Sequence, residues 1–446
     1  MRGRWHEVPD EVFQTMISEN IKEVFEKINR DRFVVGLDVN DSFAQVSYCK
    51  VDSDAPTTLS VSEESEEFNV PLYMLKRRDD GAWLFGNEAK EAEDDGVLVN
   101  NLFERARLKK TVRIDREEYL AKDIFLLFLK KVLLLFPAMV TPDKIVSITI
   151  TLKDADSDTI LMLQELPNML KVNPDILHFV TYEESFFYYM LYQPAELQNH
   201  NILLFDTSGE KLRSYSLMRN FFKSPGVATV DVKEYINFPS ETPIQYEKGE
   251  RDALFLKISS ELCNSTIYSG VYLIGQCFYS DWASESLQFL CKGRKVFKGN
   301  NLFSKGACFA AKEKMSPTGK ENKIKYLGND RLKVTIGIET DDVPKEQIAL
   351  IEAGSQWFES IGRCELVLKE TDKISIYLAY VYNNYVAHGE LTLTGLNTSN
   401  NRITRVSLEV KMVSEDTVLF KVWDMGFGEL YPSSGKDWEQ ELKLEG

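Results

Sequence analysis

The sequence predicts an α/β protein built from two like halves and followed by an all-β domain. Two apolar runs, FVVGLD at 33–38 and NILLFD at 201–206, each end on an aspartate and lead through a short turn into a second strand. After residue 326, apolar residues instead recur at every second position, which is the spacing of strands with one buried face. We therefore expect a duplicated α/β domain at 31–315 and a β-sandwich at 326–446.

The first half begins where helical spacing gives way to strand spacing. Residues 9–29 place apolar side chains at intervals of three and four, so we expect an amphipathic helix within an N-terminal segment, 1–30. The apolar run at 116–136 is expected to be one long helix, because acidic residues at its start suit a helix N-terminus. The other elements expected here are strands at 43–51, 69–75, 82–86 and 144–151 and helices at 157–170 and 181–193.

The second half repeats this order. Its hairpin continues with a strand at 211–218, which resembles the strand at 43–51 in pattern. Residues 316–325 are polar and contain proline and glycine, so we expect a linker before the β-sandwich. The other elements expected in this half are strands at about 226–233 and at 271–275 and helices at 249–264, 281–291 and 303–314.

The composition of the chain limits the kinds of partner and the cellular location that we expect. The chain has 446 residues and a formal net charge of −16, which argues against nucleic acid or an anionic membrane surface as the main partner. The most hydrophobic segment, 124–136, is interrupted by two lysines and is too short to cross a bilayer. The N-terminus lacks the apolar core of a signal peptide. The six cysteines form no CxxC pair, so we expect reduced thiols, no zinc and a cytoplasmic location.

The turn from Asp206 to Gly209 has two interpretations. A strand, an acid and a tight turn are common in ordinary β-hairpins. Alternatively, an aspartate at a strand end can face a phosphate or its metal ion, while the backbone N–H groups of the turn bind the anion. The same question arises at Asp38, which ends the first apolar run.

Three elements resemble the ATPase superfamily of actin, hexokinase and heat-shock chaperones: GLDVNDSFAQVSY at 36–48, FDTSGEKLRSYSL at 205–217 and VYLIGQCFYSDWASESLQFL at 271–290. The closest likeness is to DnaK-type heat-shock chaperones, whose first phosphate hairpin is similar to GLDVNDS. The run NNLFSKGACFAA at 300–311 resembles a late helix of these chaperones, and the β-domain stands in the place of their substrate-binding domain. The layout is also similar to that of a bacterial protein family of unknown function.

This resemblance implies a two-lobed actin-like ATPase fold with duplicated ribonuclease-H-like halves that bind ATP or ADP with Mg²⁺. It gives Asp38 and Asp206 the role of catalytic carboxylates that position the metal. Glu184, or Glu183 beside it, takes the role of the further catalytic acid. The cofactor-binding positions that it implies are Asn40, Asp41, Ser42, Ser208, Gly209, Lys211, Gly275 and Gln276.

The same positions depart from the family's pattern. The first hairpin carries Asn40, Asp41 and Ser42 in place of Gly-Thr-Thr. A carboxylate at Asp41 would lie beside the triphosphate, and two like charges at ~4 Å repel by about 4 kcal/mol at an effective dielectric constant of 20. In the second hairpin one glycine remains, and Glu210 adds a negative group. Gln276 stands where the adenosine needs bare backbone.

The sequence therefore favours a chaperone-like protein with a degenerate nucleotide site, a pseudo-ATPase that acts mainly through protein–protein interaction. The alternative is an active Mg-ATP-binding ATPase of the chaperone type, a slow enzyme whose nucleotide state couples to the β-domain. In both interpretations a protein client or partner binds the β-domain, with no role for nucleic acid or membrane. The sequence predicts no oligomeric state.

Two features of the β-domain bear on client binding. A glycine-rich turn after the strand at 418–423 carries Phe427, which we expect to plug the end of the sheet. The following sequence, KDWEQELKLEG, lacks the long helical lid of the chaperones. This departure argues against tight client capture.

Overall fold

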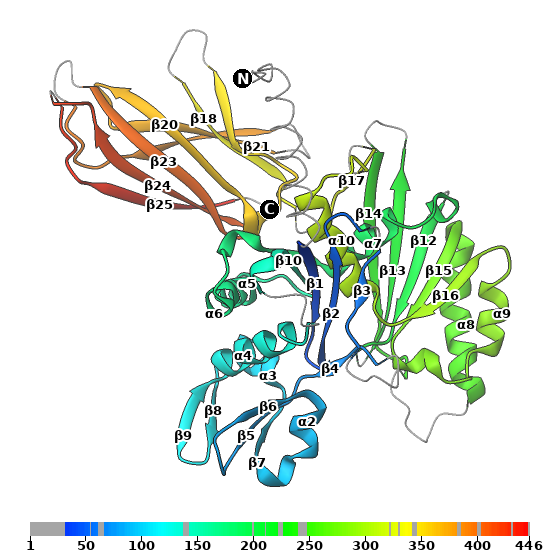
Figure 1. Ribbon diagram of the computed structural model, residues 1–446. Coiled ribbons are helices and arrows are strands. Elements are labelled where there is room, and N and C mark those ends of the chain that lie inside the picture. The colour runs from blue at the N-terminus through cyan, green and yellow to red at the C-terminus, as the bar shows by residue number, and fades with distance from the viewer. Residues whose placement is uncertain are drawn as a thin grey trace, which may run out of the picture. The chain divides into compact units, whose positions relative to one another are not determined.

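The chain divides into two compact units, each described here by itself (Figure 1). The first comprises the described residues of Met1–Lys153 and Met162–Tyr326, and the second those of Asp154–Leu161 and Leu327–Gly446. The helix expected within 1–30 lies outside the described residues. The computed structural model describes residues 32–53, 55–60, 67–136, 142–198, 200–209, 211–221, 226–239, 248–320, 323–328, 331–340, 346–380, 385–398, 403–429 and 431–444.

The first sheet is built around the run FVVGLD. Strands β1 and β2 form an antiparallel hairpin, while β10 and β11 extend the sheet parallel to β1, in the order β11-β10-β1-β2-β3 with β4 beside β2. Every residue of β1 is buried, as expected of a central strand covered on both faces. The bounds are β1 (Phe33–Val39), β2 (Phe43–Lys50), β3 (Thr57–Thr58), β4 (Val70–Pro71), β10 (Ile145–Leu152) and β11 (Leu177–Thr181).

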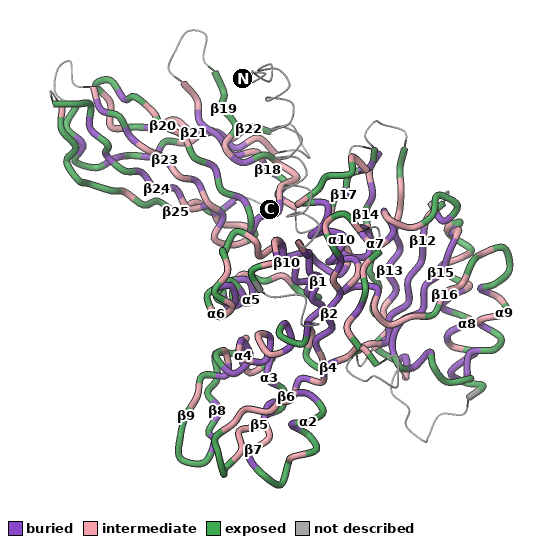
Figure 2. The backbone as a smooth tube through the Cα atoms, in the orientation of Figure 1, coloured by how far each residue is buried: buried purple, intermediate pink, exposed green. Residues whose placement is uncertain are grey.

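The second sheet is built around the run NILLFD, in the order β16-β15-β12-β13-β14-β17. Here β12 and β13 form the antiparallel hairpin and β15 and β16 run parallel to β12, so the arrangement of the first sheet recurs. Figure 2 shows that the central strands of both sheets are mostly buried. The bounds are β12 (Asn201–Asp206), β13 (Leu212–Asn220), β14 (Gly226–Tyr235), β15 (Tyr268–Ile274), β16 (Lys295–Gly299) and β17 (Ile324–Tyr326). That this is an actin-like fold stays a prediction.

The described part of the chain also contains the helices labelled α2 to α10. Among the described residues, none of them is both long and apolar enough to cross a membrane. Helices α7, α8 and α10 agree with the predicted positions to within one or two residues. The bounds are α2 (Gly86–Glu91), α3 (Leu102–Arg107), α4 (Ala121–Leu133), α5 (Ser157–Leu163), α6 (Leu166–Leu170), α7 (Tyr182–Leu191), α8 (Lys248–Ser265), α9 (Ser284–Leu290) and α10 (Leu302–Met315).

Helix α10 packs directly against the first sheet and against helix α7. At Gly36 in β1, an added Cβ would lie 2.1 Å from the backbone oxygen of Ser304. At Gly306 in α10, an added Cβ would lie 2.0 Å from the backbone oxygen of Ser185 in α7. Only glycine permits backbones to approach this closely, so these two residues fix the position of α10.

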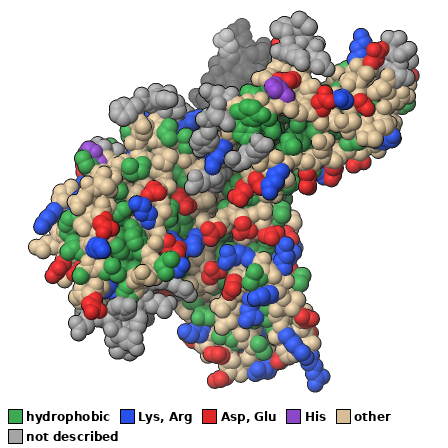
Figure 3. Space-filling view, turned by 180° about the vertical axis from the view of Figure 1, so that it is seen from behind, with side chains coloured by type: hydrophobic (Ala, Val, Ile, Leu, Met, Phe, Trp, Pro, Cys, Tyr) green, Lys and Arg blue, Asp and Glu red, His purple; other side chains and the backbone are tan. Residues whose placement is uncertain are grey.

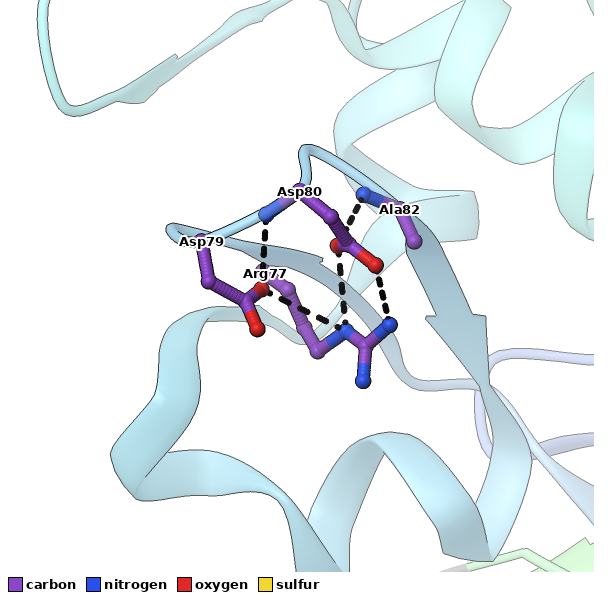
Figure 4. A network of polar contacts seen from close by, with 4 residues as sticks. All are labelled: Arg77, Asp79, Asp80 and Ala82. Atoms are coloured by element: carbon purple, nitrogen blue, oxygen red, sulfur yellow. Dashed lines mark hydrogen bonds and ion pairs between the residues drawn. The ribbon is translucent and has the colours of Figure 1, made fainter.

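A smaller part of the first unit lies between β4 and β10 along the chain. It holds a three-stranded sheet in the order β6-β5-β7 and a separate hairpin, β8 with β9. Figure 4 shows the turn that joins β5 to β6: Arg77 Nε lies 3.2 Å from Asp80 Oδ1 and 3.7 Å from Asp79 Oδ1, and Asp80 Oδ1 accepts the Ala82 N–H at 2.9 Å. The bounds are β5 (Met74–Arg77), β6 (Trp83–Phe85), β7 (Gly96–Val99), β8 (Thr111–Ile114) and β9 (Glu117–Leu120).

The second unit contains two four-stranded antiparallel sheets, in the orders β19-β18-β21-β22 and β20-β23-β24-β25. In β23 and β24 every second residue is buried, which gives each strand one apolar face. Phe427, expected to plug the sheet, is instead 45% exposed just after β24. The bounds are β18 (Val334–Glu339), β19 (Gln347–Ile351), β20 (Ile361–Lys369), β21 (Lys373–Tyr380), β22 (Val386–Thr392), β23 (Ile403–Ser414), β24 (Thr417–Gly426) and β25 (Asp437–Lys443).

The helix expected at 157–170 is divided into α5 and α6, and the strand expected at 69–75 into β4 and the start of β5; two further stretches differ in kind from the elements expected of them. The helix expected at 116–136 is wrong in its first turn, because Glu117–Leu120 form strand β9 and α4 begins only at Ala121. An ion pair of 2.7 Å between Lys76 Nζ and Glu117 Oε2 uses the acid that we expected at a helix N-terminus. The linker expected at 316–325 ends in β17, which pairs with β14 and so belongs to the second sheet.

Candidate functional site

Asp38 and Asp206 lie at the ends of the corresponding strands, Asp38 one residue before the end of β1 and Asp206 as the last residue of β12. Both are almost wholly buried, with exposed fractions of 4% and 2%. The charge of Asp206 contributes to a raised pKa at Asp38, which places the two carboxylates within electrostatic reach of one another. The two acids that the sequence pattern pairs thus influence one another through their charge, without a hydrogen bond between them among the described contacts.

The hydroxyl of Tyr182, at the start of α7, donates a hydrogen bond to Oδ1 of Asp38 at 2.7 Å. Burial raises the pKa of Asp38 to about 7, the bond from Tyr182 lowers it, and the charge of Asp206 raises it further. Burial and the neighbouring Asp38 also raise the pKa of the Tyr182 hydroxyl. Near neutral pH, Asp38 therefore exchanges a proton while Tyr182 remains its donor.

Asp206 is held by its own hairpin. Its Oδ1 accepts the backbone N–H of Ser208 at 2.7 Å. Burial raises the pKa of Asp206, while the bonds from Ser208 and the positive charges of Arg213 and Lys153 lower it. Arg213 and Lys153 are cations of the site that the sequence pattern did not indicate.

Asn40 organises the turn between β1 and β2 with its side chain. Its Oδ1 accepts the backbone N–H groups of Ser42 at 2.9 Å and of Phe43 at 3.0 Å. The backbone N–H of Asn40 donates to the Phe43 carbonyl at 3.1 Å. Such a turn satisfies its own N–H groups, because an asparagine oxygen takes the place of an external acceptor.

Asp41, in the same turn, pairs with a cation. Nη2 of Arg107 in α3 lies 3.2 Å from Oδ1 of Asp41, and the Arg107 guanidinium lies 4.8 Å from the centre of the Phe103 ring. The repulsion that we expected between Asp41 and a bound triphosphate is therefore offset in part by Arg107. No pattern in the sequence pairs these residues, which are 66 positions apart.

The other residues predicted in the second hairpin do not converge on the two acids. Lys211 Nζ lies 2.6 Å from Oε1 of Glu234 on β14. Gly209 is exposed, and an added Cβ there would meet no atom within 4 Å. Glu210 lies outside the described residues.

Gly275, predicted at the adenosine position, is buried against the second hairpin. Its φ is +100°, and an added Cβ would lie 2.5 Å from Oγ1 of Thr207. The bare backbone of Gly275 thus accommodates Thr207, whose N–H donates to the Ile274 carbonyl at 3.0 Å. Gln276 is exposed at the start of a 3₁₀ turn.

Glu184, predicted as a catalytic acid, is buried in the first turn of α7, with an exposed fraction of 1%. Its backbone N–H donates to Oγ1 of Thr181, the N-cap residue, at 3.3 Å. The residue of α7 that contacts Asp38 is Tyr182, whose ring stacks on Phe303 with centroids 4.0 Å apart. Tyr182 lies two positions before Glu184 and directly after Thr181, the last residue of β11, and this position is the signal in the sequence that could have indicated it.

The two buried acids do not by themselves make a metal site. Within the part of the chain that the structure describes, no three His, Cys, Asp or Glu side chains make a group able to hold a metal ion. Asp38 and Asp206 supply two carboxylates, and Mg²⁺ is often held by one or two carboxylates with phosphate and water oxygens. These two residues could therefore hold Mg²⁺ only together with such added ligands.

Two family models match the chain. A family of unknown function (DUF5716), in its C-terminal part, matches residues 55–329, and a domain of unknown function (DUF8552) matches residues 331–444. No curated protein matches. The first match covers more than half of the sequence, from within the first sheet to the end of the first unit. The chain therefore belongs to the family of unknown function DUF5716.

Proposed function

We propose that this protein is chaperone-like and acts mainly through protein–protein contacts, with an actin-like first unit whose nucleotide site is degenerate. Two sheets of like topology support the fold, since each contains a hairpin whose first strand carries a buried aspartate at its last position or one residue before it. A cytoplasmic location is part of the proposal, and it is supported by six cysteines that are all free thiols.

The observation that carries the proposal is the closed turn at Asn40. A phosphate bound to this hairpin would need free backbone N–H groups. Those of Ser42 and Phe43 already donate to Oδ1 of Asn40, at 2.9 and 3.0 Å. The asparagine oxygen thus takes the place that a phosphate oxygen would occupy.

The protonation of Asp38 also supports a degenerate nucleotide site. With a pKa of about 7, Asp38 is only partly charged near neutral pH, and its Oδ1 already accepts the Tyr182 hydroxyl. Mg²⁺ prefers charged carboxylates and dehydrates reluctantly. Binding would require Asp38 to lose its proton, which weakens the affinity near neutral pH.

The second unit offers an apolar strip for protein contact. Trp423, Met425 and Phe427 follow one another at every second position and are 37%, 44% and 45% exposed. The turn beside them is held by Asp424, whose Oδ2 accepts the Ser434 N–H at 2.7 Å. Figure 3 shows apolar side chains reaching the surface between charged ones on the face drawn there. Fixed, exposed aromatic residues are typical anchors of protein interfaces.

A working Mg-ATPase is the second candidate. Its support is the approach of Asp38 to Asp206, since two buried acids at matching strand ends are what a bound metal would require. In that case ATP would bind in the micromolar range, and its Mg²⁺ would displace the proton from Asp38.

Isothermal titration calorimetry separates the two candidates. We expect no heat from millimolar ATP or ADP, with or without Mg²⁺, for the wild type and for Asp206→Asn. Asp175→Asn, an exposed acid of the same unit, serves as the control. Micromolar binding that Asp206→Asn abolishes and Asp175→Asn preserves would overturn the degenerate site and establish the ATPase.

Client binding has its own test. The wild type should suppress the aggregation of reduced, unfolded α-lactalbumin, and Trp423→Ser with Phe427→Ser should lose most of this effect. Ile267→Ser removes a 72% exposed apolar side chain from the first unit and should change nothing. Equal suppression by all three proteins would exclude the strip as the client site.

A further inference from the structure

Two cysteines that lie far apart in the sequence meet inside the first unit. The Sγ atoms of Cys49, in β2, and Cys308, in α10, are 3.7 Å apart. Both residues are buried, with exposed fractions of 4% and 0%. They share a small apolar cluster with Val34 and Ala311. The two thiols are therefore in van der Waals contact, 259 positions apart in the sequence.

We propose that Cys49 and Cys308 are a modification site, a dithiol that a peroxide oxidises to a disulfide joining β2 to α10. This inference is independent of whether the first unit binds nucleotide. It rests on the contact between the sulfurs and on the fixed position of the helix that carries Cys308.

The geometry favours bond formation. A disulfide has an S–S length of about 2.05 Å, so the sulfurs must approach by less than 2 Å. The backbone of α10 already lies against the sheet, because an added Cβ at Gly36 would lie 2.2 Å from the backbone nitrogen of Cys308. Formation of the S–S bond thus requires rotation of the two cysteine side chains and small shifts of their backbones, while helix α10 keeps its position.

The surroundings give the two thiols different roles. The pKa of Cys49 lies below its ordinary value, because the hydrogen bond between the two sulfurs and the positive charge of Lys312, one turn further along α10, outweigh the burial that raises it. Burial raises the pKa of Cys308 well above its ordinary value. Because the thiolate is the nucleophile, Cys49 reacts first and Cys308 resolves the product.

The reaction balances with hydrogen peroxide as the oxidant. The Cys49 thiolate attacks one peroxide oxygen, the O–O bond breaks, and the departing hydroxide takes up a proton to form water. The Cys308 sulfur then attacks the Cys49 sulfenic acid. The S–S bond forms, the S–O bond breaks, and the thiol proton leaves with the hydroxyl group as a second water. Two thiols are oxidised and one peroxide is reduced to two waters.

The bond would lock α10 onto the first sheet. This helix also contributes Phe303, Ala307 and Ala310 to the core formed by α7 and the second sheet. A disulfide at Cys308 would therefore restrict movement between the two sheets. It would also close a very long loop in the unfolded chain, which stabilises the native state.

Peptide mapping of the full chain tests the proposal directly. The protein is fully reduced, treated with hydrogen peroxide, blocked with N-ethylmaleimide and digested without reductant. We expect a cross-linked peptide pair that contains Cys49 and Cys308, lighter by two hydrogens than the separate peptides and released by dithiothreitol. We also expect a melting temperature several degrees higher for the oxidised protein than for the reduced one.

Two single variants provide the comparison. Cys49→Ser should lose both the cross-link and the rise in melting temperature. Cys291→Ser, which removes an exposed thiol, should keep both. The proposal is overturned if peroxide leaves Cys49 and Cys308 open to alkylation in the wild type, or if the cross-links found join other cysteines. Because the mapping is read on the wild type, a folding defect in Cys49→Ser would not obscure the result.

Discussion

The Tyr182 hydroxyl lies 2.7 Å from Oδ1 of Asp38 and joins residues 144 positions apart, at the edge where β1 ends and α7 begins. A buried carboxyl group near a second buried acid is costly unless a donor or a proton compensates its charge. Here the Tyr182 hydroxyl is the donor, and the raised pKa of Asp38 keeps this carboxyl group protonated for part of the time near neutral pH. The site is thus a complete polar unit before any ligand is added.

Removing that donor should destabilise the first unit. Tyr182→Phe deletes the hydroxyl and leaves the ring stacked on Phe303, while Asp38 loses a bond in a buried place. We expect the free energy of unfolding to fall by about 1–3 kcal/mol in urea titrations near pH 7. Tyr189→Phe, in the same helix, removes a hydroxyl with no described hydrogen bond and should cost less than about 0.5 kcal/mol. Equal losses would contradict a special role for Tyr182.

Stability should fall as the pH rises from 5 to 8. The native state keeps the Asp38 proton up to a pH of about 7, whereas the unfolded chain releases it near the ordinary value of 3.8. Between these values the native state binds more protons, so each pH unit costs up to about 1.4 kcal/mol. The raised pKa of Asp206 acts in the same direction. We expect a total loss of about 3 kcal/mol between pH 5 and 8.

Urea titrations at pH 5, 6, 7 and 8 measure this slope. Asp38→Asn should flatten it, because the amide does not titrate, while Asp175→Asn should leave it unchanged. The titrations stay at pH 5 and above because carboxyl groups with lowered pKa values, such as that of Glu234, take up protons at lower pH. The protein would then lose the stability that these charged groups contribute. A wild type that gains stability toward pH 8 would contradict the assignment.

The strand ends of the site could be read from the sequence, and its side-chain partners could not. Asp38 and Asp206 each come at the end of an apolar run that forms a central strand of its own sheet. The bonds of Asn40 to its own turn and of Tyr182 to Asp38 depend on three-dimensional positions that periodicity does not encode. Asp41 illustrates the consequence, since its charge was predictable and its pairing with Arg107 was not.

Local ambiguity explains the misplaced elements. Glu117 and Glu118 suit a helix start, yet their pairing with the strand at 111–114 and the contact of Glu117 with Lys76 make them part of a hairpin. Ile324–Tyr326 are too few to show a strand period, so the last strand of the second sheet looked like a linker. In both cases the local sequence is compatible with more than one structure, and contacts with distant residues determine which one forms.

A buried amide beside the site should also contribute to stability. Gln45, opposite Asp38 in the hairpin, donates from Nε2 to Asn69 Oδ1 at 2.8 Å and accepts from Ser304 Oγ at 2.7 Å. Gln45→Leu keeps the volume and removes the hydrogen bonds of a buried amide, including the one to Asn69 Oδ1, so we expect a loss of about 1–3 kcal/mol in urea titrations. The exposed Gln276→Leu is the control and should stay within about 0.5 kcal/mol of the wild type. A loss shared by both variants would refute the network.

The close packing of α10 gives the sharpest comparison of two glycines. Gly306 in α10 and Gly249 in α8 both lie in helices, where alanine is favoured by up to about 1 kcal/mol. An added Cβ at Gly306 would lie 2.0 Å from the Ser185 backbone oxygen, whereas one at Gly249 would meet no atom within 4 Å. Helix propensity therefore predicts a gain at both positions, the smaller one at Gly249 in the first turn of α8, whereas packing predicts a loss at Gly306 alone.

We expect the packing around each glycine, rather than helix propensity, to determine the change in stability. Gly306→Ala must push α10 away from α7, because a backbone oxygen cannot turn aside as a side chain can, so the free energy of unfolding should fall by at least about 2 kcal/mol. Gly249→Ala should leave it unchanged or raise it by up to about 1 kcal/mol. Thermal and urea unfolding of the two variants measure both effects. If Gly306→Ala proved as stable as Gly249→Ala, the two helices would not touch at this point, and α10 could not hold the two sheets in a fixed relation.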